Sequence, residues 1–434
     1  MKAREIVVLV LVIAAGVFFT HVRTGRLDFD WEDYINLGWN EYTFEETRVI
    51  EPPLPPVLEV INAHGSVEIQ GTAVDSVTFT FKKRIWRRDE DKARQVAENL
   101  HPIVTRDDST LILSTNREEF RKRNFGTSFH IACPENLEVD VRNSYGLVKV
   151  QAVGKSAIRN RHGEVVASDV RGELWLENSY KPVELEKVQS RCRVKSRHAD
   201  LIARSVNGEM NIENSHGRIE LQDIAGKVTI SAPHTTISAE DLGGPVEIQN
   251  SYEKISLVRV GPADIQARHS AIDANDVRGD LRIRDDYARV KLNGISGNVW
   301  VSGKKLAVLG RSIAGEEIYV SSSYEDVELI DFSGKTTVLV SHGKASLAPL
   351  PLIAPVEVRC EYSPIILYWP SGREYPLEAQ TKNGHIRWKL PGDILIEEQN
   401  SLTTVRAFAG LADKPPFFLS TTYSDIRIEE GFPR

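Results

Sequence analysis

The feature that constrains this chain most is an 18-residue repeat that runs from about Leu137 to Leu350. Each unit is numbered from position 0, which is a tyrosine or histidine in eleven of the twelve units. Positions +3 and +8 are apolar in all twelve units, and position +10 is glycine in eight of them. A unit of this size cannot bury an apolar face by itself, but stacked units form a continuous core. The position 0 residues are Tyr145, His162, Tyr180, His198, His216, His234, Tyr252, His269, Tyr287, Lys305, Tyr324 and His342.

Short apolar alternations within the units are typical of β-strands. Val246–Ile248 and Ile255–Leu257 have the period of two that a half-buried strand shows. The glycine and the Asn-Ser-Tyr segment of many units are common turn residues. We therefore predict an all-β fold, a parallel β-solenoid (β-helix) over residues 141–350, with rungs stacked ~4.8 Å apart. The +3 and +8 side chains should lie inside, and the coil should be right-handed, as connections between parallel strands usually are.

Position +5 adds a second period of 36 residues. Units with tyrosine carry a large apolar residue there, and most units with histidine carry alanine. Alternating large and small side chains avoids both clashes and voids between stacked rungs. The large residues are Val150, Leu185, Leu257, Leu292 and Leu329, and the small ones are Ala167, Ala203, Ala239 and Ala274. The unit of His216 keeps Leu221 and so follows the tyrosine kind despite its histidine.

The segments before and after the array read as caps. Residues 57–140 hold one repeat-like piece with His64 at position 0, further strands, and one short helix over Asp89–Leu100 with its apolar residues on one face. Residues 351–434 contain looser copies near Tyr362, Asn383 and Tyr423, so we expect irregular rungs and a C-terminal cap there. Caps are expected because a bare solenoid end is an open sheet edge that invites aggregation.

The N-terminus predicts attachment to a membrane. Within residues 1–26, the unbroken apolar run Ile6–Phe19 follows Lys2 and Arg4. Its length suits a signal sequence, but no small-x-small cleavage site follows, so we predict an uncleaved single-pass anchor, with a cleaved signal as the alternative. The solenoid should then be extracytoplasmic. Residues 27–56 form a linker that ends in the stiff Pro52–Pro56 segment.

Composition narrows the possible partners. The net charge of −7, with both signs mixed, argues against nucleic-acid binding, which needs a basic face. The three cysteines, Cys133, Cys192 and Cys360, have neither a metal-binding spacing nor a disulfide pattern. Cys192 falls at an apolar position of the repeat and is expected to be a buried small hydrophobe. We expect no cofactor and no metal.

The order of the segments carries a family resemblance. LEVINAHGSVEIQG follows a proline-rich lead-in; the charged helix DEDKARQVAENL, the strand STLILSTN and serial copies such as LEVDVRNSYGLVKVQAVG and MNIENSHGRIELQDIAG come after it. Over roughly Tyr42 to Leu350 this order resembles a bacterial family named "putative adhesin", a domain of unknown function with β-strand repeats. The resemblance implies the solenoid fold and an adhesin-like role, with no established catalytic residues. The family usually has Asn-Gly in the turn, where this chain has tyrosine or histidine.

Two columns of side chains are candidate binding residues. His198, His216 and His234 occupy consecutive rungs, but a straight column does not provide the tetrahedral geometry of zinc, so ring packing is the preferred interpretation. The second column, at position −1, holds Arg161, Arg197, Arg268 and Lys304. Salt bridges to carboxylates such as Glu177, Glu213 and Asp286 would explain it, and a row of cations for an anionic polymer is the functional alternative. The predicted ligand-binding residues are Arg161, His162, Arg197, His198, Arg268 and His269.

Four functions remain open. The first is a non-catalytic, membrane-anchored envelope scaffold that binds an anionic polysaccharide or an envelope protein. The others are an envelope sensor or regulator acting through a protein partner, a structural polymer of the bactofilin type, and a polysaccharide-acting β-helix enzyme. An enzyme would need clustered acid and base groups in a groove, and the array has no insertion to build one. We therefore expect no catalytic residues.

Overall fold

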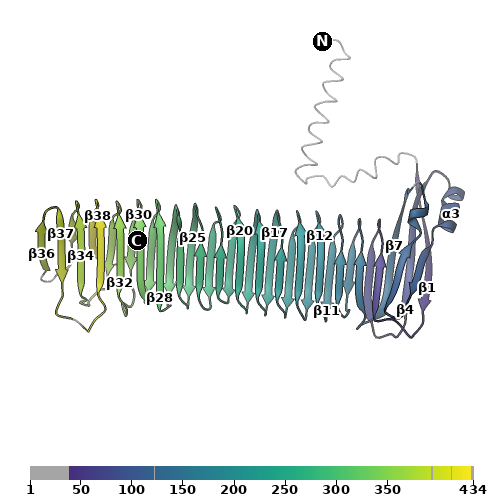
Figure 1. Cartoon of the computed structure of the whole chain (residues 1–434), viewed down its shortest axis with the longest axis horizontal. Helices are drawn as coiled ribbons and strands as arrows, with labels where there is room; N and C mark the ends of the chain where they lie inside the picture. The colour runs from purple at the N-terminus through teal and green to yellow at the C-terminus, as the bar shows by residue number, and fades with distance from the viewer. Residues whose placement is uncertain (1–38, 122, 392–393, 412, 432–434) are drawn as a thin grey trace, which may run out of the picture. The chain divides into compact units, whose positions relative to one another are not determined.

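The computed structural model describes residues 39–121, 123–391, 394–411 and 413–431, which divide into two compact units. One unit comprises Lys82–His101, Asn116–Gly126 and the described residues up to Glu46. The other comprises Thr47–Phe81, Pro102–Thr115 and the chain from Thr127 onward. The second unit is a parallel β-solenoid whose strands stack side by side (Figure 1), as the repeat predicted.

Each regular rung supplies one strand to each of two sheets. Sheet A contains, in spatial order, β7 (Phe125–Pro134), β3 (Val67–Thr72), β9 (Val148–Gln151), β11 (Val165–Val170), β13 (Val183–Val188), β15 (Leu201–Val206), β17 (Gly217–Ile224), β19 (Thr235–Leu242), β21 (Ile255–Val260), β23 (Ile272–Val277), β25 (Ala288–Ile295), β27 (Leu306–Ile313), β29 (Val327–Phe332), β31 (Ala345–Ala348), β33 (Ile365–Trp369), β39 (Ile426–Glu430) and β35 (Ile386–Trp388).

Sheet B contains, in the same sense, β5 (Pro102–Arg106), β6 (Thr110–Thr115), β2 (Val57–Ile61), β8 (Glu138–Arg142), β10 (Ser156–Arg159), β12 (Leu174–Ser179), β14 (Cys192–Arg197), β16 (Met210–Glu213), β18 (Val228–Pro233), β20 (Val246–Ser251), β22 (Ala263–Gln266), β24 (Leu281–Arg284), β26 (Val299–Lys304), β28 (Glu317–Ser323), β30 (Lys335–Ser341), β32 (Val356–Glu361), β38 (Phe417–Thr422), β34 (Leu377–Lys382), β37 (Leu402–Ala407) and β36 (Ile394–Gln399).

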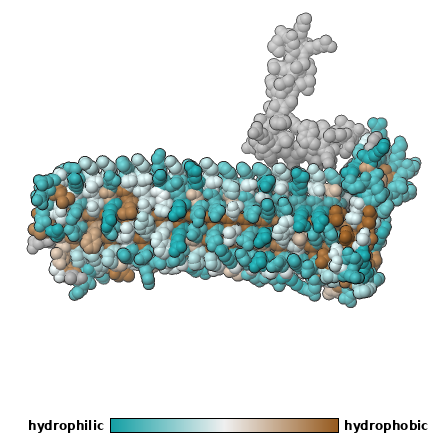
Figure 2. All heavy atoms as spheres, in the orientation of Figure 1, coloured by the Kyte–Doolittle hydropathy of each residue, from teal (hydrophilic) through white to brown (hydrophobic). Residues whose placement is uncertain are grey.

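Strands in neighbouring rungs pair so that residues at the same position of the repeat lie opposite one another. Val183 pairs with Val165 in the preceding rung and with Leu201 in the following one, all three at position +3. The +3 and +8 side chains are buried in every regular rung up to β29, and hydrophilic side chains cover most of the surface that Figure 2 shows. The all-β parallel solenoid is therefore confirmed, and the right-handed coil stays a prediction.

The predicted alternation at position +5 is present in the core. Leu221 pairs with Ala203 on one side and Ala239 on the other, and Ala239 pairs in turn with Leu257. Gly310 continues the series between Leu292 and Leu329. A Cβ atom at Gly310 would lie 2.8 Å from Leu329 Cδ2, so glycine leaves room here for the large side chain in the next rung.

The glycines at position +10 stack on one another. A Cβ atom on Gly226 would lie 2.3 Å from the carbonyl oxygen of Gly208, and one on Gly244 would lie 2.5 Å from that of Gly226. Real Cβ atoms do not approach a carbonyl this closely, because packed backbones have no room to yield. Glycine at position +10 therefore lets these rungs stack closely at this turn.

The chain does not enter or leave the solenoid at its outermost rungs. β2 lies between β8 and β6, so the first rung of the chain is not the terminal one. β38 likewise lies between β32 and β34, as Figure 1 shows. The rung that contains Tyr423 is therefore the last in the sequence, but it lies between two other rungs of the solenoid. The repeat pattern, in which each unit follows the one before it, did not predict this insertion. Sheet B ends in antiparallel strands on both sides, β5 on β6 and β36 on β37.

The other unit contains the predicted helix. α3 spans Glu90–Asn99, Asp89 is its N-cap, and the Asp89 carboxylate accepts a hydrogen bond from the Lys92 backbone N–H. Ala93 and Ala97 are buried, as their spacing predicted. A 3-10 helix, η1, spans Arg117–Glu119. The strands β1 (Asn40–Ile50) and β4 (Val77–Arg87) run from one unit into the other.

The membrane prediction cannot be compared with the fold, because Ile6–Phe19 lies outside the described residues. Within residues 39–431, apart from the gaps given above, no helix is long and apolar enough to cross a membrane. The three cysteines are free and buried. Burial raises the pKa of the Cys192 thiol to about 12, as expected for an unreactive core residue.

Candidate ligand-binding site: a ring ladder beside an arginine column

The position 0 side chains lie at the turn that joins a sheet B strand to the next sheet A strand. From Tyr180 onward their backbone is left-handed, with φ of 70° at Tyr180 and 55° at His198, a conformation that few non-glycine residues adopt. A buried asparagine two residues earlier supports many of these turns. The Asn178 side-chain amide donates to the Lys181 carbonyl oxygen at 2.8 Å, closing the turn around Tyr180.

The rings at position 0 stack into one column, the ring ladder, which Lys305 interrupts between Tyr287 and Tyr324. Neighbouring centroids lie 4.6 to 5.7 Å apart. Lys305 replaces a ring, and its Nζ lies 5.2 Å from the Tyr287 centroid and 6.0 Å from that of Tyr324. The rings are His64, Tyr145, His162, Tyr180, His198, His216, His234, Tyr252, His269, Tyr287, Tyr324, His342, Tyr362 and Tyr423.

The ladder exposes ring edges. The exposed fraction is 45% for Tyr145 and 57% for Tyr324, while the ring faces cover one another. The ladder therefore offers a row of hydroxyl groups and imidazole nitrogens to solvent at the rung spacing.

The three consecutive histidines are part of this stacking. His216 lies 4.8 Å from His198 and 5.1 Å from His234, measured between ring centroids. Among the described residues no group of three or more histidine, cysteine or carboxylate side chains is placed to hold a metal ion.

The arginine column lies directly beside the ladder, at position −1. Arg161, Arg197 and Arg268 are exposed, and within the part of the chain that the structure describes none of them forms an ion pair. The expected neutralising salt bridges are therefore not formed. Glu213 instead lies 3.8 Å from Lys195, and Asp286 accepts the backbone N–H of Lys304 at 2.7 Å. Glu177 and Glu213 lie at position −3, in a different column of the same face, whereas Asp286 lies at position −1, between Arg268 and Lys304, and its carboxylate binds a backbone N–H.

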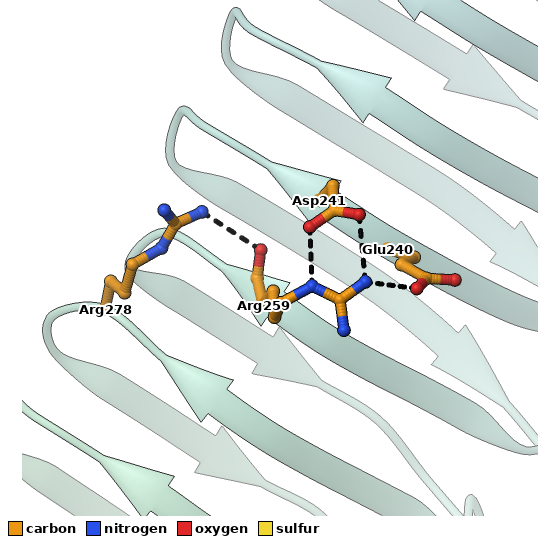
Figure 3. A network of polar contacts seen from close by, with 4 residues as sticks. All are labelled: Glu240, Asp241, Arg259 and Arg278. Carbon is orange, nitrogen blue, oxygen red and sulfur yellow. Dashed lines mark hydrogen bonds and ion pairs between the residues drawn. The ribbon is translucent and has the colours of Figure 1, made fainter.

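Cations at the opposite bend of the rung behave differently. At position +7, Arg259 Nε donates to Asp241 Oδ1 at 2.7 Å, and its Nη2 donates to Asp241 Oδ2 at 2.9 Å and also to Glu240 (Figure 3). The hydrogen bonds from Arg259 lower the pKa of the Asp241 carboxyl. Arg278 donates in turn to the Arg259 carbonyl oxygen at 3.1 Å. This column satisfies its charges internally, so the position −1 arginines stand out as cations left for a ligand.

A cavity of about 350 Å³ opens at the N-terminal rungs, lined in part by Glu68, His130 and Lys149. His130 Nδ1 lies 3.6 Å from Glu68 Oε2. Glu68 is the only carboxylate among the lining residues of this cavity, whereas most glycosidases use a pair.

The sequence predicted two columns of side chains, and the structure places these columns side by side but adds interactions that the sequence did not predict. His162, His198 and His269 belong to the ring ladder, and Arg161, Arg197 and Arg268 flank it. The tyrosines were assigned to turns, although their recurrence at position 0 contained the signal for a single ladder. Lys305 also joins the ladder, through contacts with the rings on either side.

Comparisons with known proteins do not show which family this chain belongs to. No family model matches the chain, and no curated protein matches it. Among solved structures, a protein from Clostridium sporogenes described as a "putative cell adhesion protein" aligns over 90% of this chain and 100% of its own length, with 9% identity and a TM-score of 0.19. A similarity this low does not establish a shared function, and the resemblance to the adhesin family stays a prediction.

Proposed function

We propose that this protein is a non-catalytic, adhesin-like scaffold that is held at a membrane by its N-terminus and binds an anionic polysaccharide of the cell envelope. The observation that carries the proposal is the set of exposed, unpaired arginines beside the ring ladder. Guanidinium groups bind carboxylates through two parallel hydrogen bonds, and the tyrosine and histidine edges add neutral donors and acceptors for sugar hydroxyls.

The spacing of the column suits a polymer with its own repeat. Arg161 and Arg197 lie two rungs apart, as do Arg268 and Lys304, which corresponds to ~9.6 Å at the parallel strand spacing. Each exposed contact is weak and screened by salt, so useful affinity requires that many contacts act together.

The test compares polysaccharides that differ in charge. The full chain in detergent is passed over immobilised polygalacturonate and over neutral dextran at low salt. Retention on polygalacturonate alone, lost at high salt, supports the proposal. Equal behaviour on both polymers contradicts it, because the arginine column has no anion to bind on dextran.

A further inference from the structure

Between β10 and β26, the cations on the outer face of sheet B lie in two separate patches. The N-terminal patch, on β10, β12 and β14, consists of Arg159, Trp175, Arg193, Lys195 and Arg197. The C-terminal patch, on β24, β26 and the turn after β22, consists of Arg268, Arg282, Arg284, Trp300 and Lys304. All eight cationic side chains are exposed.

The two patches share one internal arrangement, a tryptophan with an arginine stacked on it. Arg159 Cζ lies 4.4 Å from the Trp175 ring centroid, and Arg282 Cζ lies 4.7 Å from that of Trp300. Stacking on an indole holds a guanidinium flat against the ring. Arg159 Nη1 also donates to Asp140 Oδ1 at 3.3 Å, whereas Arg282 forms no ion pair within the described residues.

Further cations lie beside each stacked pair. Arg193 pairs in register with Trp175, and Arg197 with Ser179. In the second patch, Arg282 pairs in register with Trp300, and Arg284 continues the same strand. Each patch can therefore present several donors to one anionic group, which in the N-terminal patch would displace Asp140 from Arg159 and Glu213 from Lys195.

The strands between the patches carry no such groups. β16, β18 and β20 contain no lysine or arginine, and they contain Glu213 and Glu247. Four rung steps separate Arg197 on β14 from Arg268 after β22, a gap of ~19 Å, and seven steps separate the two tryptophans, a span of ~34 Å.

We infer that sheet B binds an anionic polysaccharide at two equivalent sites, so that a single long chain bridges both patches and a short oligomer fills one. This inference rests on the proposed function and deepens it. A uniform strip would gain affinity gradually with polymer length, whereas two patches produce a step when the polymer becomes long enough to span the gap. Bridging turns the second contact into an intramolecular one, which raises affinity by ~10²-fold or more.

The test titrates the full chain in detergent with oligogalacturonates of defined length, followed by calorimetry. A short oligomer should be smaller than the ~19 Å gap, and a long one should exceed the ~34 Å span. We expect two equal, weak sites for the short oligomer. The long oligomer should bind one per protein, ~10²-fold more tightly.

Patch variants separate the two sites. Arg193→Ser with Lys195→Ser removes one patch, and Arg282→Ser with Arg284→Ser removes the other. Each variant should keep one short-oligomer site and bind the long oligomer no more tightly than the short one. The control variant, Arg204→Ser with Lys291→Ser, makes the same charge change on sheet A and should bind like wild type.

The outcomes distinguish this inference from the proposed function. If the wild type binds oligomers but each patch variant weakens the long one by no more than about twofold, the two-site inference is wrong and a uniform strip stands. If the wild type binds no oligomer of any length, the proposed function fails as well. Thermal unfolding of each variant, unchanged from wild type, confirms that the comparison is between folded proteins.

Discussion

Asp285 occupies the buried turn position that Asn250 fills two rungs earlier. The Asn250 amide donates to the Thr235 carbonyl oxygen at 3.0 Å, whereas Asp285 Oδ2 accepts the backbone N–H of Ser270 at 3.2 Å. Both side chains are buried, and burial raises the pKa of the Asp285 carboxyl from 3.8 to about 6. Asp285 is thus an ionisable side chain at a turn position where other rungs have a neutral one, such as Asn250.

The first prediction is that Asp285→Asn stabilises the protein at neutral pH. The folded-state pKa lies above the unfolded one, so the folded state binds the proton more tightly and wild-type stability falls as pH rises from about 4 to about 6. The variant should be more stable by about 2 kcal/mol at pH 7 and equal below pH 4. Urea unfolding of both proteins across this range measures the difference. Asn250→Asp is the reverse control and should introduce the same loss, and a constant difference between wild type and Asp285→Asn would contradict the account.

The second prediction concerns the alternation at position +5. Ala239→Leu should destabilise the solenoid by ~1–3 kcal/mol, because the new side chain meets Leu221 and Leu257 in the adjacent rungs. Ser238→Leu places the same side chain on the exposed neighbour and serves as the control. Chemical unfolding of both variants measures the difference. An unfolding midpoint for Ala239→Leu equal to that of the wild type would contradict the claim that large and small residues must alternate at position +5.

The third prediction concerns the glycine stack. Gly226→Ala should destabilise the fold by more than ~1 kcal/mol, because its Cβ atom would lie 2.3 Å from the Gly208 carbonyl oxygen and the rungs would have to separate. A Cβ atom at Gly410 meets nothing within 4 Å, so Gly410→Ala is the matched control. Thermal unfolding should separate the two variants, and similar melting temperatures would show that the stack tolerates a methyl group.

The fourth prediction concerns the interruption of the ring ladder. Lys305→Tyr should stabilise the protein by ~0.5–1.5 kcal/mol, because it inserts a ring between Tyr287 and Tyr324 and completes the stack. Lys304→Tyr, one residue away and outside the ladder, is the control. A lower unfolding midpoint for Lys305→Tyr than for the control would show that the ladder needs a cation at this rung.

The regular rungs could be predicted because each position sees the same neighbours in every unit. Val183 and Leu201 share an environment, so their identical spacing translates directly into register. The ends could not be predicted in this way. β38 pairs with both β32 and β34. The repeat pattern indicates that the residues around Tyr423 form a rung, but it does not indicate between which strands that rung lies.

The sequence predicted which residues form the two columns of the candidate site, but it did not predict which side chains these residues contact. Position −1 and position 0 were recognised from their residue types, yet salt bridges were expected for Arg161, Arg197 and Arg268. Sequence distance alone does not show that nearby carboxylates project from other columns, as Glu213 does toward Lys195. The stacks of Arg159 on Trp175 and Arg282 on Trp300 also needed the structure, since they join residues of adjacent rungs.

The measurement that tests the central claim most directly is the affinity of the full chain for polygalacturonate as a function of salt. It compares wild type with the triple variant Arg161→Ser, Arg197→Ser and Arg268→Ser. A control triple variant, Arg204→Ser, Arg289→Ser and Arg311→Ser, loses the same charge from the strands of sheet A. We predict that the position −1 variant loses at least ~10-fold in affinity at low salt and depends less steeply on salt, while the control binds like wild type. Equal affinity and equal salt dependence in all three proteins would contradict the claim that the arginine column beside the ring ladder is the binding surface.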